Sequence, residues 1–82
     1  MIHILYFANF RELLGQSEEK IPSTHATVSD LLAELAARGG DWKRALTENT
    51  QLQIAVNHNI ASRETPIKAG DEIAFFPPVT GG

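Results

Sequence analysis

The fold is decided by Glu72-Ile73-Ala74-Phe75-Phe76-Pro77-Pro78, an apolar run that is followed at once by two prolines. A short run rich in Ile and Phe is typical of a β-strand. Proline cannot donate a hydrogen bond to a neighbouring strand and favours an extended backbone. We therefore predict a last strand over residues 72–76, after which the proline pair ends the sheet and directs the chain away from it.

A second strongly apolar segment opens the sequence, Ile2-His3-Ile4-Leu5-Tyr6-Phe7-Ala8. Apart from His3 it is apolar at every position, which favours a central strand covered on both sides. The first and last strands are the most apolar in the sequence, so both are expected to be central. Placed next to each other and parallel, they leave room for one helix to cross a face of the sheet.

That helix is predicted over residues 28–38, with an apolar stripe at helical spacing. The stripe consists of Val28, Leu31, Leu32, Leu35 and Ala36. Thr27 is the expected N-cap, and Asp30 stands where a capping box needs an acceptor. Glu34 and Arg38 are four residues apart and are expected to pair on the exposed face. Gly39-Gly40 should stop the helix.

The remaining elements are shorter. A helical turn is predicted over 10–14, with Asn9 as its cap and Gly15 as its end. The others are an edge strand over 18–21, a short helix over 41–46 whose Trp42 covers the edge of the core, a strand over 52–56 and an extended piece from Ile60. This order predicts an α+β protein with a β-grasp, or ubiquitin-like, fold. A mixed sheet would carry one main helix on one face and short extra helices. Residues 1–76 form this domain, and 77–82 form an extended tail.

Composition excludes several classes of function. The 82 residues carry a formal charge of -3 and no basic run, so a nucleic-acid partner is not expected. No apolar run approaches the ~20 residues of a membrane span, and no signal peptide opens the chain, which predicts a cytoplasmic protein without a membrane partner. The sequence has no cysteine, and its three histidines, expected at the surface or in turns, lack metal-ligand spacing. We therefore expect no bound metal or cofactor.

The sequence ends in Phe75-Phe76-Pro77-Pro78-Val79-Thr80-Gly81-Gly82, which resembles the end of the small, ubiquitin-like sulfur-carrier subunits of molybdopterin synthases. Further matches to this family are Tyr6-Phe7-Ala8, Arg11-Glu12-Leu13 with Gly15, Ala55-Val56-Asn57 and Gly70-Asp71-Glu72. A double glycine is also thin enough to enter a narrow channel, because it has no side chains.

The resemblance implies a function that resides in the carboxyl group of Gly82. A ubiquitin-activating-like adenylyltransferase would use ATP to adenylate Gly82, and a sulfur donor enzyme would convert it to a thiocarboxylate. The tail residues Pro77, Pro78, Val79, Thr80 and Gly81 would insert into the large synthase subunit. Sulfur would then pass to the cyclic pyranopterin precursor and form the dithiolene of molybdopterin. The chain would be no enzyme on its own, but a subunit of a heterotetramer with two large subunits.

Strand parity predicts which residues meet the partner. Phe75 and Phe76 point to opposite faces, so we expect Phe75 in the core and Phe76 on an exposed apolar patch with Ile60. Arg11 matches a family position and is expected at the interface. Three alternatives remain open: a thiamine-pathway sulfur carrier, a ubiquitin-like modifier that forms isopeptide bonds with lysines, and a binding module with an inert tail.

Overall fold

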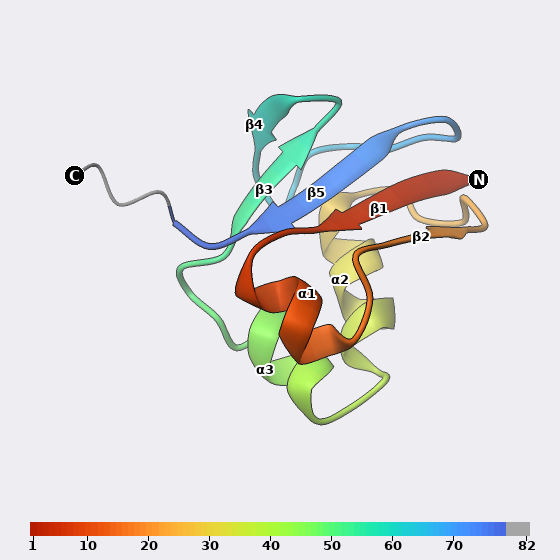
Figure 1. The fold of residues 1–82 in the computed structure, drawn as a ribbon. Coiled ribbons are helices and arrows are strands. Elements are labelled where there is room, and N and C mark those ends of the chain that lie inside the picture. The colour runs from red at the N-terminus through yellow and green to blue at the C-terminus, as the bar shows by residue number, and fades with distance from the viewer. Residues whose placement is uncertain (79–82) are drawn as a thin grey trace.

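The computed structural model describes residues 1–78, and its strands and helices follow the predicted order (Figure 1). In chain order the elements are β1 (Ile2–Tyr6), α1 (Asn9–Leu14), β2 (Glu18–Ile21), α2 (Val28–Ala36), α3 (Asp41–Leu46), β3 (Gln53–Val56), β4 (Asn59–Ala61) and β5 (Glu72–Phe76). The strand at residues 72–76 and the helix at 41–46 have the predicted bounds. The strand predicted from Leu52 begins one residue later, at Gln53.

The strands form a mixed sheet in the order β2-β1-β5-β3-β4. The central strands β1 and β5 are parallel, with Ile4 opposite Ile73. The pairs β1–β2, β3–β5 and β3–β4 are antiparallel. The two ends of the described chain thus supply the two adjacent parallel strands, as the apolar character of both segments predicted. This topology, with one main helix against the sheet, confirms the β-grasp fold.

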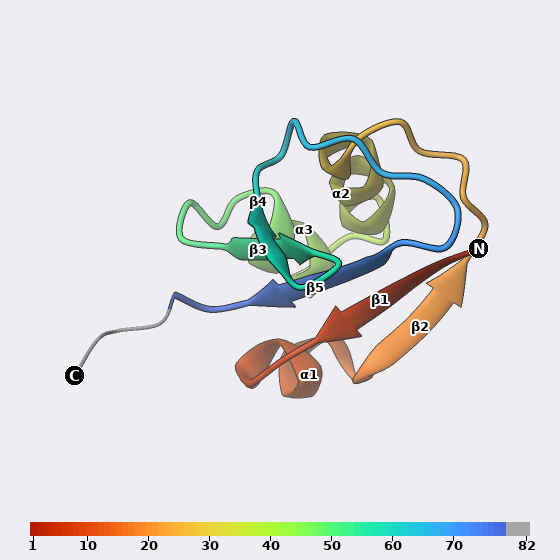
Figure 2. The same cartoon turned by 90° about the horizontal axis from the view of Figure 1, so that it is seen from above.

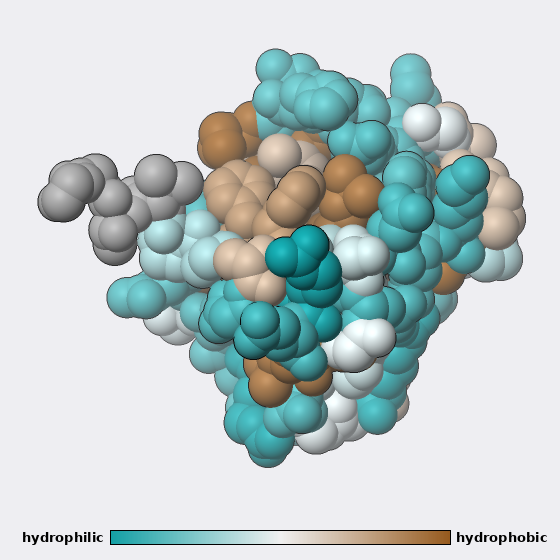
Figure 3. Space-filling model, viewed as in Figure 1, coloured by the Kyte–Doolittle hydropathy of each residue, from teal (hydrophilic) through white to brown (hydrophobic). Residues whose placement is uncertain are grey.

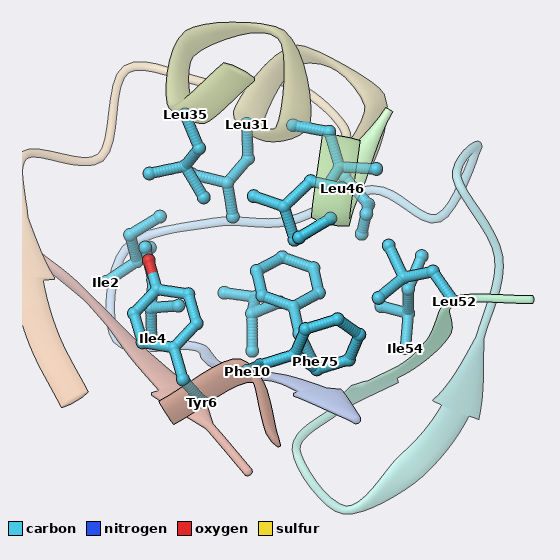
Figure 4. Close-up of a cluster of buried hydrophobic side chains, with 14 of the residues drawn as sticks. Ile2, Ile4, Tyr6, Phe10, Leu31, Leu35, Leu46, Leu52, Ile54 and Phe75 are labelled. Carbon is cyan, nitrogen blue, oxygen red and sulfur yellow. The ribbon is translucent and has the colours of Figure 1, made fainter. Parts of the chain in front are cut away.

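The helices α2 and α3 cover one face of the sheet (Figure 2). Between them and the strands lies the core, where aromatic rings from β1 and β5 meet aliphatic side chains from α2 (Figure 4). The largest fully buried side chains are Tyr6, Phe75, Ile2, Ile4, Leu31, Leu32, Leu35, Leu46, Ile73 and Val28. The short helix α1 adds Phe10 and Leu14 to this core.

The beginning of α2 confirms the predicted capping box, whereas its end differs from the prediction. Thr27 accepts a hydrogen bond from the Asp30 N–H, and the Asp30 carboxylate accepts one from the Thr27 N–H. The helix ends at Ala36, with Ala37 as its cap, so Arg38 lies beyond it. The predicted Glu34–Arg38 pair is therefore wrong.

Arg38 instead connects the segment after α2 to the edge strand β2 and to α3. Its guanidinium lies 2.9 Å from a Glu19 carboxylate oxygen and 4.4 Å from the centre of the Trp42 ring. Trp42 packs against the core, as predicted, with its ring 5.5 Å from that of Tyr6. Arginine favours such a stacked arrangement, because its flat cation is attracted to the aromatic face.

Two predictions for the first segment are also corrected. The strand β1 ends at Tyr6, and only its Ile2, Ile4 and Tyr6 side is buried, because α2 and α3 lie on one side of the sheet. Asn9 is the first residue of α1 and not its cap. The cap is Ala8, which makes no side-chain hydrogen bond. Gly15 ends α1 in the left-handed conformation that glycine tolerates, as predicted.

Candidate functional site

The described part of the predicted tail starts where β5 stops. This strand ends at Phe76, Pro77 is half-buried and Pro78 is exposed. The other tail residues named from the sequence, Val79, Thr80, Gly81 and Gly82, lie outside the described residues. The structure therefore locates the base of the tail, next to the C-terminal end of the two central strands.

The sheet face opposite α2 is apolar around this point. Register places four side chains in one row across four strands: Leu5 of β1, Ala74 of β5, Ala55 of β3 and Ile60 of β4. Phe76 follows Ala74 by two residues on the same face, because side chains alternate along a strand. The Phe7 N–H continues the pairing to the Phe75 carbonyl at 3.1 Å, so the same alternation brings Phe7 to this face.

These residues form one apolar surface, visible over the strands in Figure 3. We call it the open-face patch and define it as Leu5, Phe7, Ala55, Ile60, Ala74 and Phe76. Ile60 is 73% exposed and Phe7 46%, whereas Phe76 is half-buried. A contiguous exposed apolar patch is typical of a protein-docking surface.

The opposite end of the same face is polar. Register aligns Lys20, His3 and Glu72 in a row across β2, β1 and β5. The His3 imidazole lies 2.9 Å from a Glu18 carboxylate oxygen, and His58 lies 3.6 Å from Glu72. The open-face patch therefore extends from the middle of this face to the end from which the tail continues, where Phe76 lies opposite Gln53.

The structure places two of the three predicted interface residues on the same face of the sheet. Phe75 is fully buried, as predicted, and Phe76 lies on the same face as Ile60, with β3 between their strands. Arg11 is an exposed residue of α1, which lies on the far side of β1 from β4 (Figure 1). Whether any of the three contacts a partner stays a prediction.

The sequence reasoning missed Phe7 and Leu5. The sequence predicts a strand covered on two sides, yet both residues share parity with His3, the one polar residue of that segment. That parity was the available signal: a polar side chain marks the solvent-facing side, and a single long helix can cover only one face of a sheet.

Two titratable side chains, those of Tyr6 and His25, lie at or near the core. Burial raises the pKa of the Tyr6 phenol above its usual value, and the hydroxyl donates to Glu19 at 3.2 Å. His25, expected at the surface or in a turn, has a side chain only 6% exposed and bonds Glu34 at 2.9 Å.

Within residues 1–78 no pocket is found, and no group of three possible metal ligands is found there either. No helix of this part of the chain is long and apolar enough to cross a membrane.

Comparison with known proteins relates the chain to a group of small carrier proteins. Two relatives are named "molybdopterin synthase sulfur carrier subunit": one from Escherichia coli, 44% identical, and one from Haemophilus influenzae, 43% identical. Each alignment spans 82 residues and covers 100% of both chains. A relative from Haloferax volcanii, named "small archaeal modifier protein 3", is 33% identical and aligns over 99% of this chain and 98% of its own.

Solved structures of similar proteins have the same fold as this chain. The putative molybdopterin converting factor subunit 1 of Pyrococcus furiosus is 35% identical, with a TM-score of 0.75 over 95% of this chain and 97% of its own. A chain in the complex of subunits 1 and 2 of the molybdopterin-converting factor of Helicobacter pylori is 26% identical, with a TM-score of 0.68 over 99% and 97%. The sequence model of the ThiS family matches residues 4–82. The chain therefore belongs to the ThiS family.

Proposed function

We propose that this chain is the sulfur carrier subunit of a molybdopterin synthase. The observation that carries the proposal is the end-to-end match to two proteins of that name, at 43% and 44% identity over all 82 residues. The β-grasp fold and the apolar surface beside the base of the tail support it. Residues 77–82 act as the delivery arm, and the folded domain before them acts as the part that partners recognise.

The chemistry takes place at the Gly82 carboxyl group. An α-carboxyl group has a pKa of about 3.5, so at neutral pH it is an anion and a poor electrophile. Attack of this carboxylate on the α-phosphate of ATP releases pyrophosphate and gives an acyl-adenylate. A donor of sulfide-level sulfur then displaces AMP and leaves a thiocarboxylate. After the sulfur has passed to the cyclic pyranopterin precursor, water restores the carboxylate.

The carrier itself needs no catalytic side chain for these steps. The sequence has no cysteine, so the thiocarboxylate is the sulfur nucleophile that this chain can present. An adenylyltransferase of the ubiquitin-activating kind supplies the ATP site, and a separate enzyme supplies the sulfur. The large synthase subunit supplies the precursor pocket and the acids and bases of the transfer.

The open-face patch is the docking surface for the large subunit in this proposal. It reaches the end of the sheet where β5 leads into Pro77, so a partner that covers the patch also faces the base of the tail. Phe7, Phe76 and Ile60 provide the large side chains that fill pockets in a partner. Arg11 extends the surface along α1. The relative in the Helicobacter pylori complex supports a pairing of small and large subunits, and we propose two of each in the assembly.

Reconstitution tests the proposal. The purified chain is incubated with a ubiquitin-activating-like adenylyltransferase, ATP and a sulfur donor, and its intact mass is recorded. The expected product is heavier by the difference between sulfur and oxygen. Addition of the large subunit and the precursor should return the original mass and yield molybdopterin. A chain that gains sulfur but transfers none to the precursor would contradict the molybdopterin assignment and favour the thiamine-pathway carrier.

One observation favours a second candidate, a protein modifier. The Haloferax volcanii relative carries the word modifier in its name and aligns over nearly the whole of both chains. A modifier would form an isopeptide bond between Gly82 and a lysine of a target protein. Mass spectrometry of extracts from the native cell separates the two functions, because a modifier gives a ladder of conjugates and a dedicated carrier gives only the free chain.

A further inference from the structure

The chain builds the same β-turn twice, each time at the entrance to a six-residue helix. In the turns at residues 7–10 and 39–42, the first carbonyl accepts a hydrogen bond from the N–H of the fourth residue at 3.1 Å. The second residue is Ala8 in one turn, with φ 54° and ψ -133°, and Gly40 in the other, with φ 53° and ψ -123°. These angles belong to the first central position of a type II′ turn, where glycine dominates because a Cβ atom is strained.

Packing does not explain why one copy has glycine and the other alanine. A Cβ atom added at Gly40 would meet nothing within 4 Å, so space for a methyl group exists there. Ala8 is exposed, so its methyl group fills no part of the core. In the chain alone, the methyl group of Ala8 therefore brings backbone strain and adds nothing to the core.

The strained turn lies beside the open-face patch. Phe7, immediately before it, is 46% exposed and belongs to the patch, whereas Phe10, which closes the turn, is 3% exposed and belongs to the core. The Ala8 carbonyl also accepts the Arg11 N–H at 3.1 Å, at the first turn of α1. Ala8 thus lies between Phe7 and Arg11, which we place at the docking surface.

We propose that the methyl group of Ala8 is itself a contact of this docking surface, and that the large synthase subunit covers it together with Phe7. This inference rests on the proposed function. Strained residues concentrate at functional sites, and stability is commonly lost there in exchange for function. In the complex the methyl group, exposed in the free chain, becomes buried against the partner.

Matched substitutions at the two turns test the inference. Ala8→Gly should raise the melting temperature by about 4–8 °C, because it relieves the strain in a domain of this size. It should also weaken binding to the purified large subunit about threefold to fourfold, as expected for one lost buried methyl group. Gly40→Ala should lower the melting temperature by a similar amount and leave the dissociation constant unchanged.

Binding is measured by calorimetric titration well below every melting temperature, so that unfolding does not contribute. Equal dissociation constants for the wild-type chain and Ala8→Gly would overturn the inference, as would a lower melting temperature of Ala8→Gly. A wild-type chain that fails to bind the large subunit would overturn the proposed function, and this inference with it. Binding of the wild type therefore distinguishes the two failures.

Discussion

The side chain of Asp71 joins the turn before β5 to the turn between β3 and β4. Its carboxylate accepts the Asn57 amide at 2.9 Å and the Lys68 backbone N–H at 2.9 Å. The amide oxygen of Asn57 in turn accepts the Glu72 N–H at 2.9 Å. These bonds, first that from Asn57 and then that from Lys68, hold the pKa of Asp71 below its usual value. Only 7% of this residue is exposed, so water replaces little of the network.

Asp71→Ala should destabilise the fold by about 1–3 kcal/mol at pH 7, because it leaves two partly buried donors, those of Asn57 and Lys68, unpaired. A carboxyl group with a lower pKa in the folded than in the unfolded chain stabilises the fold above its unfolded pKa of about 3.9. That contribution is lost as the pH falls through the folded pKa. The difference in free energy of unfolding between wild type and variant should therefore become smaller in acid. Urea titrations at pH 7 and in acid, followed by the fluorescence of Trp42, the one tryptophan of the chain, measure the free energy of unfolding of the wild type and the variant.

Asp41→Ala is the matched control. Its carboxylate bonds Arg44 at 2.7 Å on an exposed helix, and an exposed ion pair of this kind contributes at most about 1 kcal/mol. If Asp71→Ala cost no more than Asp41→Ala at pH 7, or if its effect were the same at pH 7 and in acid, the structural role of Asp71 would be refuted.

Single-residue roles were the least predictable part of the sequence. The Glu34–Arg38 pair failed because it assumed two more residues of helix than α2 contains. The actual partners, His25 of Glu34 and Glu19 of Arg38, lie outside the helix, and only the folded chain brings them close. The Thr27–Asp30 capping box was predictable, because both of its residues belong to one local turn.

At the scale of elements, α2 provides the main apolar layer over the sheet. Leu35 is fully buried within it, so Leu35→Ala should cost about 2–5 kcal/mol, as for other leucines removed from cores. Leu13 of α1 is 45% exposed, and the same change there should cost under about 0.5 kcal/mol. Chemical denaturation of the two variants gives the comparison, and similar losses would show that Leu35 is not a core residue.

The elements themselves were predictable because local patterns specify them. The helical spacing of apolar residues located α2, and the prolines after Phe76 located the end of β5. The parallel pairing of β1 and β5 followed from the apolar character of both segments. The prediction that β1 is covered on both faces was wrong. The sequence of a mostly apolar strand is the same whether its second face meets a helix of the same chain or, as we propose, another protein.

At the scale of the whole molecule, one sheet face holds the core and the other carries the open-face patch. Phe75 is buried in the core, whereas Phe76 belongs to the open-face patch, so truncation of Phe76 should affect partner binding more than folding. Phe76→Ala should weaken binding to the large subunit by at least about 2 kcal/mol, roughly thirtyfold, if Phe76 fills a pocket there. Its cost to folding should be smaller, about 1 kcal/mol, since the ring is only half-buried.

Phe7→Ala should behave like Phe76→Ala, because both belong to the open-face patch. Lys43→Ala, an exposed change on α3 at the helical side of the molecule, is the control and should leave binding unchanged. Titration calorimetry gives the affinity of each variant for the large subunit, and urea unfolding gives its free energy of unfolding. Partner affinity that is the same for Phe76→Ala and wild type would reject the placement of the docking surface on this face.

The sharpest test at this scale concerns the chain end, which lies outside the described residues. Deletion of Gly82 should abolish sulfur transfer while the fold and most of the partner affinity persist. One residue spans up to ~3.5 Å, so its removal withdraws the carboxyl group by about that distance. Reacting atoms must approach to about 3–3.5 Å, and the loss of one residue therefore separates the thiocarboxylate from its target.

Two further variants should fail for different chemical reasons. A residue added after Gly82 turns its carboxylate into an amide and leaves nothing there to adenylate. Gly81→Val places a branched, stiff side chain where we propose that the partner's channel accepts bare backbone. All three variants should melt close to the wild type, because the buried core lies within residues 1–78. If the chain without Gly82 still converted precursor at the wild-type rate in the reconstituted system, the sulfur would not travel on this carboxyl group. A binding module with an inert tail would then explain the fold and the patch better than a carrier.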